Sequence, residues 1–196
     1  MDKEVQECIN KQEQIVKQEY MYSLAEQDLT ERFEFRNIRA DEAEQAAEIE
    51  SICFSAEEAC SSKMMYERVE MAPELFLVAV DRSTGKIAGF LNGISTDECS
   101  FRDEFFSDAS LHDAGGKNIM LLGLDVRPEY RGQGLARALM CCYVRREGQN
   151  GKQMLVLTCS QSKVKMYEKM GFLDHGIADS SWGGSQWHEM RYMLHA

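Results

Sequence analysis

Apolar residues run almost without interruption from residue 119 to residue 126, and this run shows no helical stripe. A continuous apolar segment of this length is typical of a central strand that is covered on both faces. Pro128 follows, and a proline cannot donate a hydrogen bond to a strand ladder. The glycine-rich turn 131–134 then leads into Leu135 and a run of strong helix formers. The pattern therefore predicts a buried strand, a tight turn and a helix that begins near residue 135.

The rest of the chain alternates between helix-like and strand-like stretches. Apolar stripes at three- and four-residue spacing indicate helices, and alternation or short apolar runs indicate strands. The expected helices cover residues 3–28, 43–53, 62–71, 135–147 and 163–170, and the expected strands cover 33–39, 75–80, 87–94, 119–126, 154–159, 172–178 and 186–194. This order predicts an α/β fold with a mixed central sheet of about six to seven strands flanked by helices.

The helix predicted over residues 3–28 precedes the first strand and is an addition to the sheet. We therefore expect an N-terminal helical extension, residues 1–30, followed by one domain, residues 31–196. With 196 residues the chain is long enough for a single domain with a proper core. The stripe of the extension packs either on its own domain or against a second subunit in a homodimer, and the sequence leaves both alternatives open.

Composition narrows the class of protein. The chain is 44% apolar and 28% charged, no apolar run approaches the ~20 residues of a membrane helix, and the N-terminus lacks a signal-peptide layout. We expect a cytoplasmic protein with no membrane partner. The net charge of −11 disfavours a nucleic-acid partner, which needs a basic patch. The seven cysteines show no Cys-x-x-Cys and no metal-ligand spacing, so we expect reduced thiols and no metal.

The turn 131–134 is the strongest candidate for chemistry. The first amides of a helix have no internal partners and lie at the positive end of the helix dipole. Glycines let a ligand approach this backbone closely, and Arg131 adds a fixed positive charge. The turn predicts a site for a phosphate or pyrophosphate. It fits neither the G-x-G-x-x-G fingerprint nor the Walker loop, which disfavours a nucleotide-binding protein.

Two segments carry a family resemblance. Residues 126–136, VRPEYRGQGLA, resemble the acetyl-CoA signature of the GNAT N-acetyltransferases, Arg/Gln-x-x-Gly-x-Gly/Ala after a strand. Residues 166–172, MYEKMGF, resemble the second landmark of that family, a helix that carries a tyrosine and ends in Gly-Phe. The resemblance implies the GNAT fold and acetyl-CoA as co-substrate.

The resemblance also implies roles for individual residues. The backbone of the strand end at Leu124 would hold the pantetheine arm and polarise the thioester carbonyl, and the amides of the turn would hold the pyrophosphate. Tyr167 would protonate the leaving thiolate of CoA, a role that suits a phenol with an ordinary pKa near ~10. The implied cofactor-binding residues are Leu124, Asp125, Val126, Arg131, Gly132, Gln133, Gly134, Leu135, Ala136, Arg137 and Tyr167.

Residues 35–194 further resemble the arylalkylamine (serotonin-type) N-acetyltransferases, in segments 73–75, 97–98, 111–112 and 184–190. This implies a primary amine of a small molecule, of arylalkylamine or polyamine type, as the acceptor. That group carries two histidines on the central strand, where this chain has Met120 and Leu122, which cannot titrate. His188 is our candidate base, because histidine titrates near neutrality. Other candidates are Glu189, Asp97, Glu98 and His112.

The acceptor pocket is expected to include Phe54, Met120, Leu122 and Trp182. Asp125, a carboxylate inside an apolar strand, is interpreted as a paired structural acid rather than the base. The sequence leaves two alternatives to a small-molecule acetyltransferase. One is a noncatalytic acyl-CoA-binding module, suggested by the missing histidines, and the other is a protein N-terminal or lysine acetyltransferase.

Overall fold

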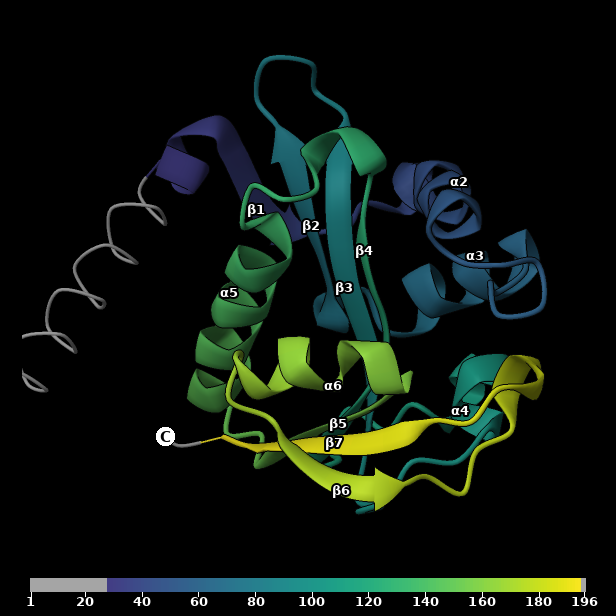
Figure 1. Cartoon of the computed structure of the whole chain (residues 1–196). Coiled ribbons are helices and arrows are strands. Elements are labelled where there is room, and N and C mark those ends of the chain that lie inside the picture. Colours follow the sequence, from purple (N-terminus) through teal and green to yellow (C-terminus); the bar gives the residue numbers. More distant parts are fainter. Residues whose placement is uncertain (1–27, 195–196) are drawn as a thin grey trace, which may run out of the picture.

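The computed structural model describes residues 28–194, which form a seven-stranded sheet in the order β1-β2-β3-β4-β5-β7-β6 (Figure 1). Neighbouring strands are antiparallel except β4 and β5, which are parallel. The strands are β1 (Phe33–Asn37), β2 (Phe76–Asp81), β3 (Ile87–Thr96), β4 (Asn118–Val126), β5 (Met154–Cys159), β6 (Leu173–Ile177) and β7 (His188–Met193). The prediction of a mixed α/β sheet is confirmed.

Helices cover both faces of this sheet. In Figure 1, α5 lies on one face of β1–β4, and α2 and α3 lie on the other. The α-helices are α2 (Ala43–Cys53), α3 (Ser62–Met71), α4 (Glu104–Ser107), α5 (Leu135–Gln149) and α6 (Gln161–Glu168), and the 3₁₀ turns are η1 (Ala40–Glu42), η2 (Pro73–Leu75), η3 (Ala109–Leu111), η4 (Pro128–Tyr130) and η5 (Trp182–Gly184). None of the helices in this described part is long and apolar enough to cross a membrane.

Residues 1–27, which hold almost all of the predicted N-terminal helix, lie outside the described residues, so the extension and its homodimer contact stay predictions. The predicted strand 87–94 is longer in the structure. It continues to Thr96 because Ser95 and Thr96 pair with Ile119 and Asn118 of β4. The connection to β4 therefore begins at residue 97.

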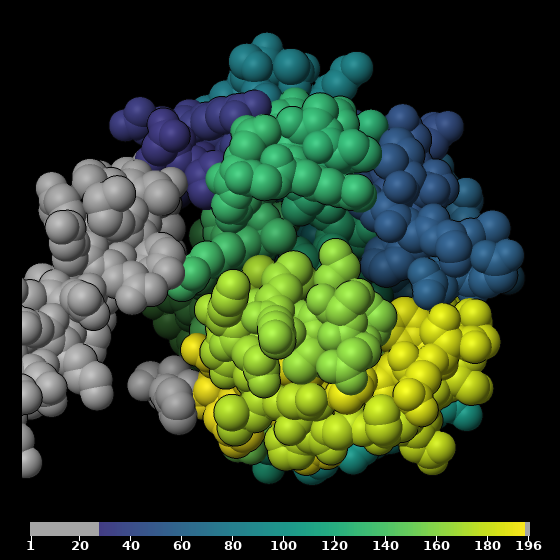
Figure 2. Space-filling model, viewed as in Figure 1, coloured from purple at the N-terminus to yellow at the C-terminus, as the bar shows by residue number. Residues whose placement is uncertain are grey.

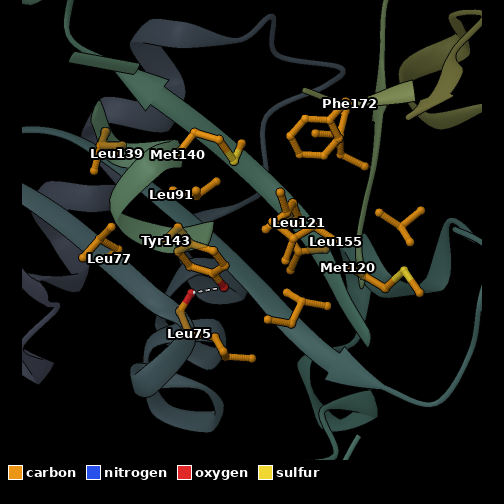
Figure 3. Packing of buried hydrophobic residues seen from close by; sticks show 14 of the residues in the cluster. Leu75, Leu77, Leu91, Met120, Leu121, Leu139, Met140, Tyr143, Leu155 and Phe172 are labelled. Carbon is orange, nitrogen blue, oxygen red and sulfur yellow. Dashed lines mark hydrogen bonds between the residues drawn. The ribbon is translucent and has the colours of Figure 1, made fainter. Parts of the chain in front are cut away.

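Side chains of β2 alternate between two separate cores, one on each face of the sheet. Phe76 and Val78 pack under α2 and α3, whereas Leu77 and Ala79 face α5. Figure 3 shows the larger core, in which the buried Tyr143 of α5 donates a hydrogen bond of 3.0 Å from its hydroxyl to the carbonyl oxygen of Leu75. These two cores fix the helices against the sheet and so position everything attached to them.

The sheet opens between β4 and β5. The two strands pair only from Asn118 to Met120, against Met154 to Val156, and then separate. On its other side β4 carries a bulge, because Asn92 is opposite Gly123 while Gly93 is opposite Leu121, which leaves Leu122 as the extra residue. A bulge bends a strand and increases its twist. The second half of β4 therefore presents an edge with no strand beside it.

Candidate active site

A cavity of about 630 Å³ lies where β4 and β5 separate. Small-molecule sites usually have volumes of ~300–1,000 Å³. In Figure 2 the surface is hollowed between the turn after β4 (green), α6 (lime) and the α2–α3 region (blue). We call the part built by the turn 131–134 and the start of α5 the loop side. The part lined by Glu50, Phe54, Glu58, Arg68, Phe106, Trp182 and Trp187 is the aromatic side.

The loop side offers a row of backbone amides. Gly132 and Gly134 have φ of 73° and 87°, the left-handed region that glycine adopts without strain. The first hydrogen bond of α5 runs from the amide of Ala138 to the carbonyl of Gly134 at 3.0 Å. Within residues 28–194, the amides of residues 132–136 donate no hydrogen bond. Such a row at a helix start is suited to an anion.

Three cationic residues line the same cavity as these amides. Arg131, Arg137 and Lys163 all line the cavity. The Nε of Arg131 donates to the carbonyl of Val126 at 2.8 Å, which fixes the guanidinium at the end of β4. Gln133, in contrast, turns away from the cavity, because its side chain accepts from Arg32 at 2.6 Å and donates to the carbonyl of Glu129 at 3.0 Å.

Leu124 and Tyr167 also line the cavity, from the open edge of β4 and from α6. Burial, and then the charges of Cys159 and Asp125, raise the pKa of the Tyr167 phenol well above its ordinary value. The phenol therefore keeps its proton at neutral pH and can donate it. Its ring packs edge-on against Phe172, with centroids 5.6 Å apart, which fixes the direction of the hydroxyl.

Two thiols also line the cavity, but both are poor nucleophiles. Burial raises the pKa of Cys53 to about 11 and that of Cys159 to about 12. A thiol attacks as the thiolate, so neither group is activated at neutral pH. Neither cysteine forms a disulfide.

The aromatic side is assembled from loops that hold one another. Trp182 stacks on Phe106 with ring centroids 5.0 Å apart, and its Nε1 donates to the carbonyl of Glu58 at 2.9 Å. Trp187 donates from its Nε1 to the carbonyl of Trp182 at 2.8 Å. Phe54 and Trp182, which the sequence predicted for the acceptor pocket, both line the cavity.

The structure separates the two central-strand residues that the sequence placed together. Leu122 lines the cavity, whereas Met120 is fully buried in the core and does not line it (Figure 3). The prediction for Met120 is wrong because it assumed unbroken alternation along β4, and the bulge at Leu122 interrupts that alternation.

His188 also lies apart from the cavity. It is buried on β7, and its Nδ1 is 3.1 Å from both carboxylate oxygens of Asp174. Among the other candidates, Glu189 accepts from the amide of Phe101 at 2.9 Å, and the Nε2 of His112 is 2.9 Å from Glu74. Asp97, Glu98, His112 and Glu189 likewise do not line it. The partners of His188, Glu189 and His112 therefore hold these side chains in place away from the cavity.

Two buried charged residues that line the cavity were not predicted from the sequence. Glu50 and Arg68 are almost fully buried, at 3% and 4% exposure, and both line the aromatic side. A signal was present for Glu50, because it falls on the same helical stripe as Ala43, Ala46 and Cys53. A carboxylate on an apolar stripe needs a partner or a function.

Comparisons with known proteins agree with this geometry. The model of the acetyltransferase (GNAT) family matches residues 21–172. No curated protein matches the chain significantly. Among solved structures, the loading GNATL domain of CurA from Lyngbya majuscula is similar with a TM-score of 0.70 and 14% identity, over 83% of this chain and 98% of that one.

Two further structures of acetyltransferases show the same fold. The ribosomal-protein-S18-alanine N-acetyltransferase from Escherichia coli matches with a TM-score of 0.62 and 17% identity, over 84% of this chain and 95% of that one. A phosphinothricin acetyltransferase from Sinorhizobium meliloti, in complex with acetyl-CoA, matches at 0.59 and 17%, over 84% and 89%. Together with the family model, the fold and the cavity, this shows that the chain belongs to the GNAT acetyltransferase family, whose general reaction is acyl transfer from acyl-CoA.

Proposed function

We propose that this protein transfers the acetyl group of acetyl-CoA to the primary amine of a small molecule. One observation carries the proposal: a single cavity joins the unpartnered amides at the start of α5, the open edge of β4 and the phenol of Tyr167. These three features would serve as a diphosphate site, a site for an extended amide-bearing chain and a proton donor.

The loop side fits the diphosphate of the co-substrate. The amides of residues 132–136 would donate to its oxygens, and Arg131, Arg137 and Lys163 would balance its charge. The backbone of Leu124 to Val126 would pair with the pantetheine amides as a strand does. A Leu124 backbone amide directed at the thioester carbonyl would stabilise the oxyanion that forms during attack.

Tyr167 is the proposed general acid. The C–N bond forms, the C–S bond breaks, and the phenol protonates the departing thiolate. The raised pKa of Tyr167 ensures that the proton is present at neutral pH. The neutral state of Cys53 and Cys159 favours direct attack by the amine over an acyl-thiol intermediate.

A small acceptor is favoured over a protein by the construction of the aromatic side. Trp182 is held by Phe106 and by Glu58 in a fixed wall, and such a wall suits a small acceptor better than a peptide. The noncatalytic module remains the alternative class, because the strand positions that carry histidines in arylalkylamine N-acetyltransferases are Met120 and Leu122 here.

Release of the CoA thiol from acetyl-CoA, measured across a panel of small amines and peptides, tests the proposal. We expect turnover with a small amine, a loss of kcat of about 100-fold in Tyr167→Phe, and unchanged acetyl-CoA affinity in that variant. Tyr66→Phe is the matched control, because Tyr66 is exposed on α3 and does not line the cavity. Acetyl-CoA binding without turnover would establish the module, and turnover with peptides alone would establish a protein acetyltransferase.

A further inference from the structure

We propose that Glu50, paired with Asp125 behind it, accepts the proton that an incoming ammonium must lose before it can attack the thioester. This inference rests on the proposed acetyl transfer to an amine and supplies the base that the missing strand histidines leave unassigned. Glu50 lines the cavity and is the catalytic residue of the pair. Asp125 is fully buried outside the cavity lining and is a positioning residue.

A glycine makes room for this carboxyl pair. A Cβ atom on Gly123 would lie 2.9 Å from Oδ2 of Asp125 and 3.4 Å from Oε2 of Glu50. The same point is 3.6 Å from Nδ2 of Asn92 on β3. Oxygens from α2 and β4 therefore converge on one small space beside the open strand edge, and only glycine leaves this space unfilled.

The converging oxygens lack donors. Oε1 of Glu50 accepts from the amide of Cys60 at 3.1 Å, which anchors the side chain. In contrast, Oε2 of Glu50 and both carboxylate oxygens of Asp125 have no hydrogen-bond partner in the described part of the chain. Buried polar oxygens are normally satisfied, and one that is not is explained by a proton, a water molecule or a ligand.

The charges around the pair favour one shared proton. Arg68 of α3 is the cation that faces it, and its Nη2 is committed to the carbonyl of Phe106 at 2.9 Å. The other titratable neighbours are the neutral thiols of Cys53 and Cys60 and the neutral phenol of Tyr167. One guanidinium balances one carboxylate, and two adjacent buried carboxylates do not both ionise.

The direction of each pKa agrees with this charge balance. Burial, and next the negative charge of Glu50, raise the pKa of Asp125 well above its ordinary value. Burial also raises the pKa of Glu50, although Arg68 opposes the rise. The result is a pair with one negative charge, of which the member facing the cavity is Glu50.

The proton balance of the reaction is complete with this pair. The ammonium transfers one proton to the Glu50–Asp125 anion. The amine and the carboxyl pair are then both neutral. The neutral amine attacks the thioester carbon, and the C–S bond breaks as Tyr167 protonates the sulfur. The second proton of the nitrogen replaces the one that Tyr167 gave, and the pair returns its own proton to the solvent after the amide leaves.

The pH dependence of kcat/KM in Glu50→Gln tests the role of the pair. Glutamine still accepts a hydrogen bond from Cys60, so the fold is retained. We expect kcat/KM at neutral pH to fall about 100-fold, and the acidic limb of the profile to move up toward the pKa of the free amine. Glu44→Gln is the matched control, because Glu44 is exposed on the same helix; it should change neither quantity. Acetyl-CoA affinity should be unchanged in both variants.

A second measurement is independent of turnover. The infrared spectrum of the wild-type protein at neutral pH should contain the carbonyl stretch of a protonated carboxyl, and Glu50→Gln and Asp125→Asn should lose it. Absence of this band in the wild type, or activity of Glu50→Gln within about threefold of wild type with an unmoved acidic limb, overturns the inference. A protein that carries the band but acetylates no amine contradicts the proposed function and the proton-accepting role, while the carboxyl pairing stands.

Discussion

The two sides of the cavity are built in different ways. The loop side consists of consecutive residues, 131–137, and its chemistry is that of backbone amides at a helix start. The aromatic side consists of side chains from α2, α3, the α4 region and the β6–β7 connection. Backbone chemistry depends on conformation, whereas side-chain chemistry depends on which distant segments meet. We therefore expect the fold to fix the proposed acetyl-CoA site and the loops to specify the proposed acceptor site.

The sharpest test of this contrast is Gly134→Val. Gly134 has a φ of 87°, which a β-branched residue adopts only with strain, so the amide row should lose its geometry. We expect acetyl-CoA affinity to fall at least about 100-fold, or ~2.7 kcal/mol, by calorimetry. Gly85→Val imposes similar strain in the β2–β3 turn, at φ 69° with no atom near its Cβ, and should leave affinity unchanged.

Gly123→Ala tests the aromatic side in the same manner. The new methyl group would lie 2.9 Å from Asp125 and must displace that carboxylate. We expect the rate of acetyl transfer to fall about 30-fold, within the contribution of a positioned base, while acetyl-CoA binding stays within about threefold. An equal loss of both would show that the two sides are not separable.

The loop side was predictable from the sequence because its residues are contiguous. The order Val126, Pro128, Gly132 and Gly134 before a helix specifies the conformation and hence the amides. The aromatic side was only partly predictable. Phe54 and Trp182 line the cavity, whereas the bulge at Leu122 keeps Met120 out of it. The helical stripe carried a signal for Glu50, but its proximity to Arg68 is purely tertiary and could not be predicted.

Trp182→Ala should disturb the aromatic side alone. The substitution removes the stack on Phe106 and the hydrogen bond to Glu58, so the loops lose their mutual support. We expect KM for the amine to rise about tenfold, in line with loss of a buried aromatic anchor, with KM for acetyl-CoA unchanged. Steady-state kinetics with each substrate varied in turn will distinguish these effects.

The smallest expected effect is on stability. Because the folded protein raises the pKa of Asp125, the wild type binds more protons folded than unfolded, and stability falls as pH rises through that raised pKa. Asp125→Asn never ionises and escapes this loss. Between about pH 5 and about pH 9, we expect the difference in Tm between Asp125→Asn and the wild type to rise by about 3 °C in favour of the variant, equivalent to ~1 kcal/mol. Parallel melting curves for both proteins across this range would contradict the raised pKa.

Only three residue pairs, Asn118 to Met120 with Met154 to Val156, link β1–β4 to β5–β7 through the ladder. This short ladder lies beside the cavity that we propose as the acetyl-CoA site. A ligand that pairs with the open edge of β4 and also contacts β5 would hold the two parts of the sheet together. Deuterium exchange of the β5–β7 amides should therefore slow when acetyl-CoA is added. Local separation of β5 from β4 would then require release of the bound acetyl-CoA.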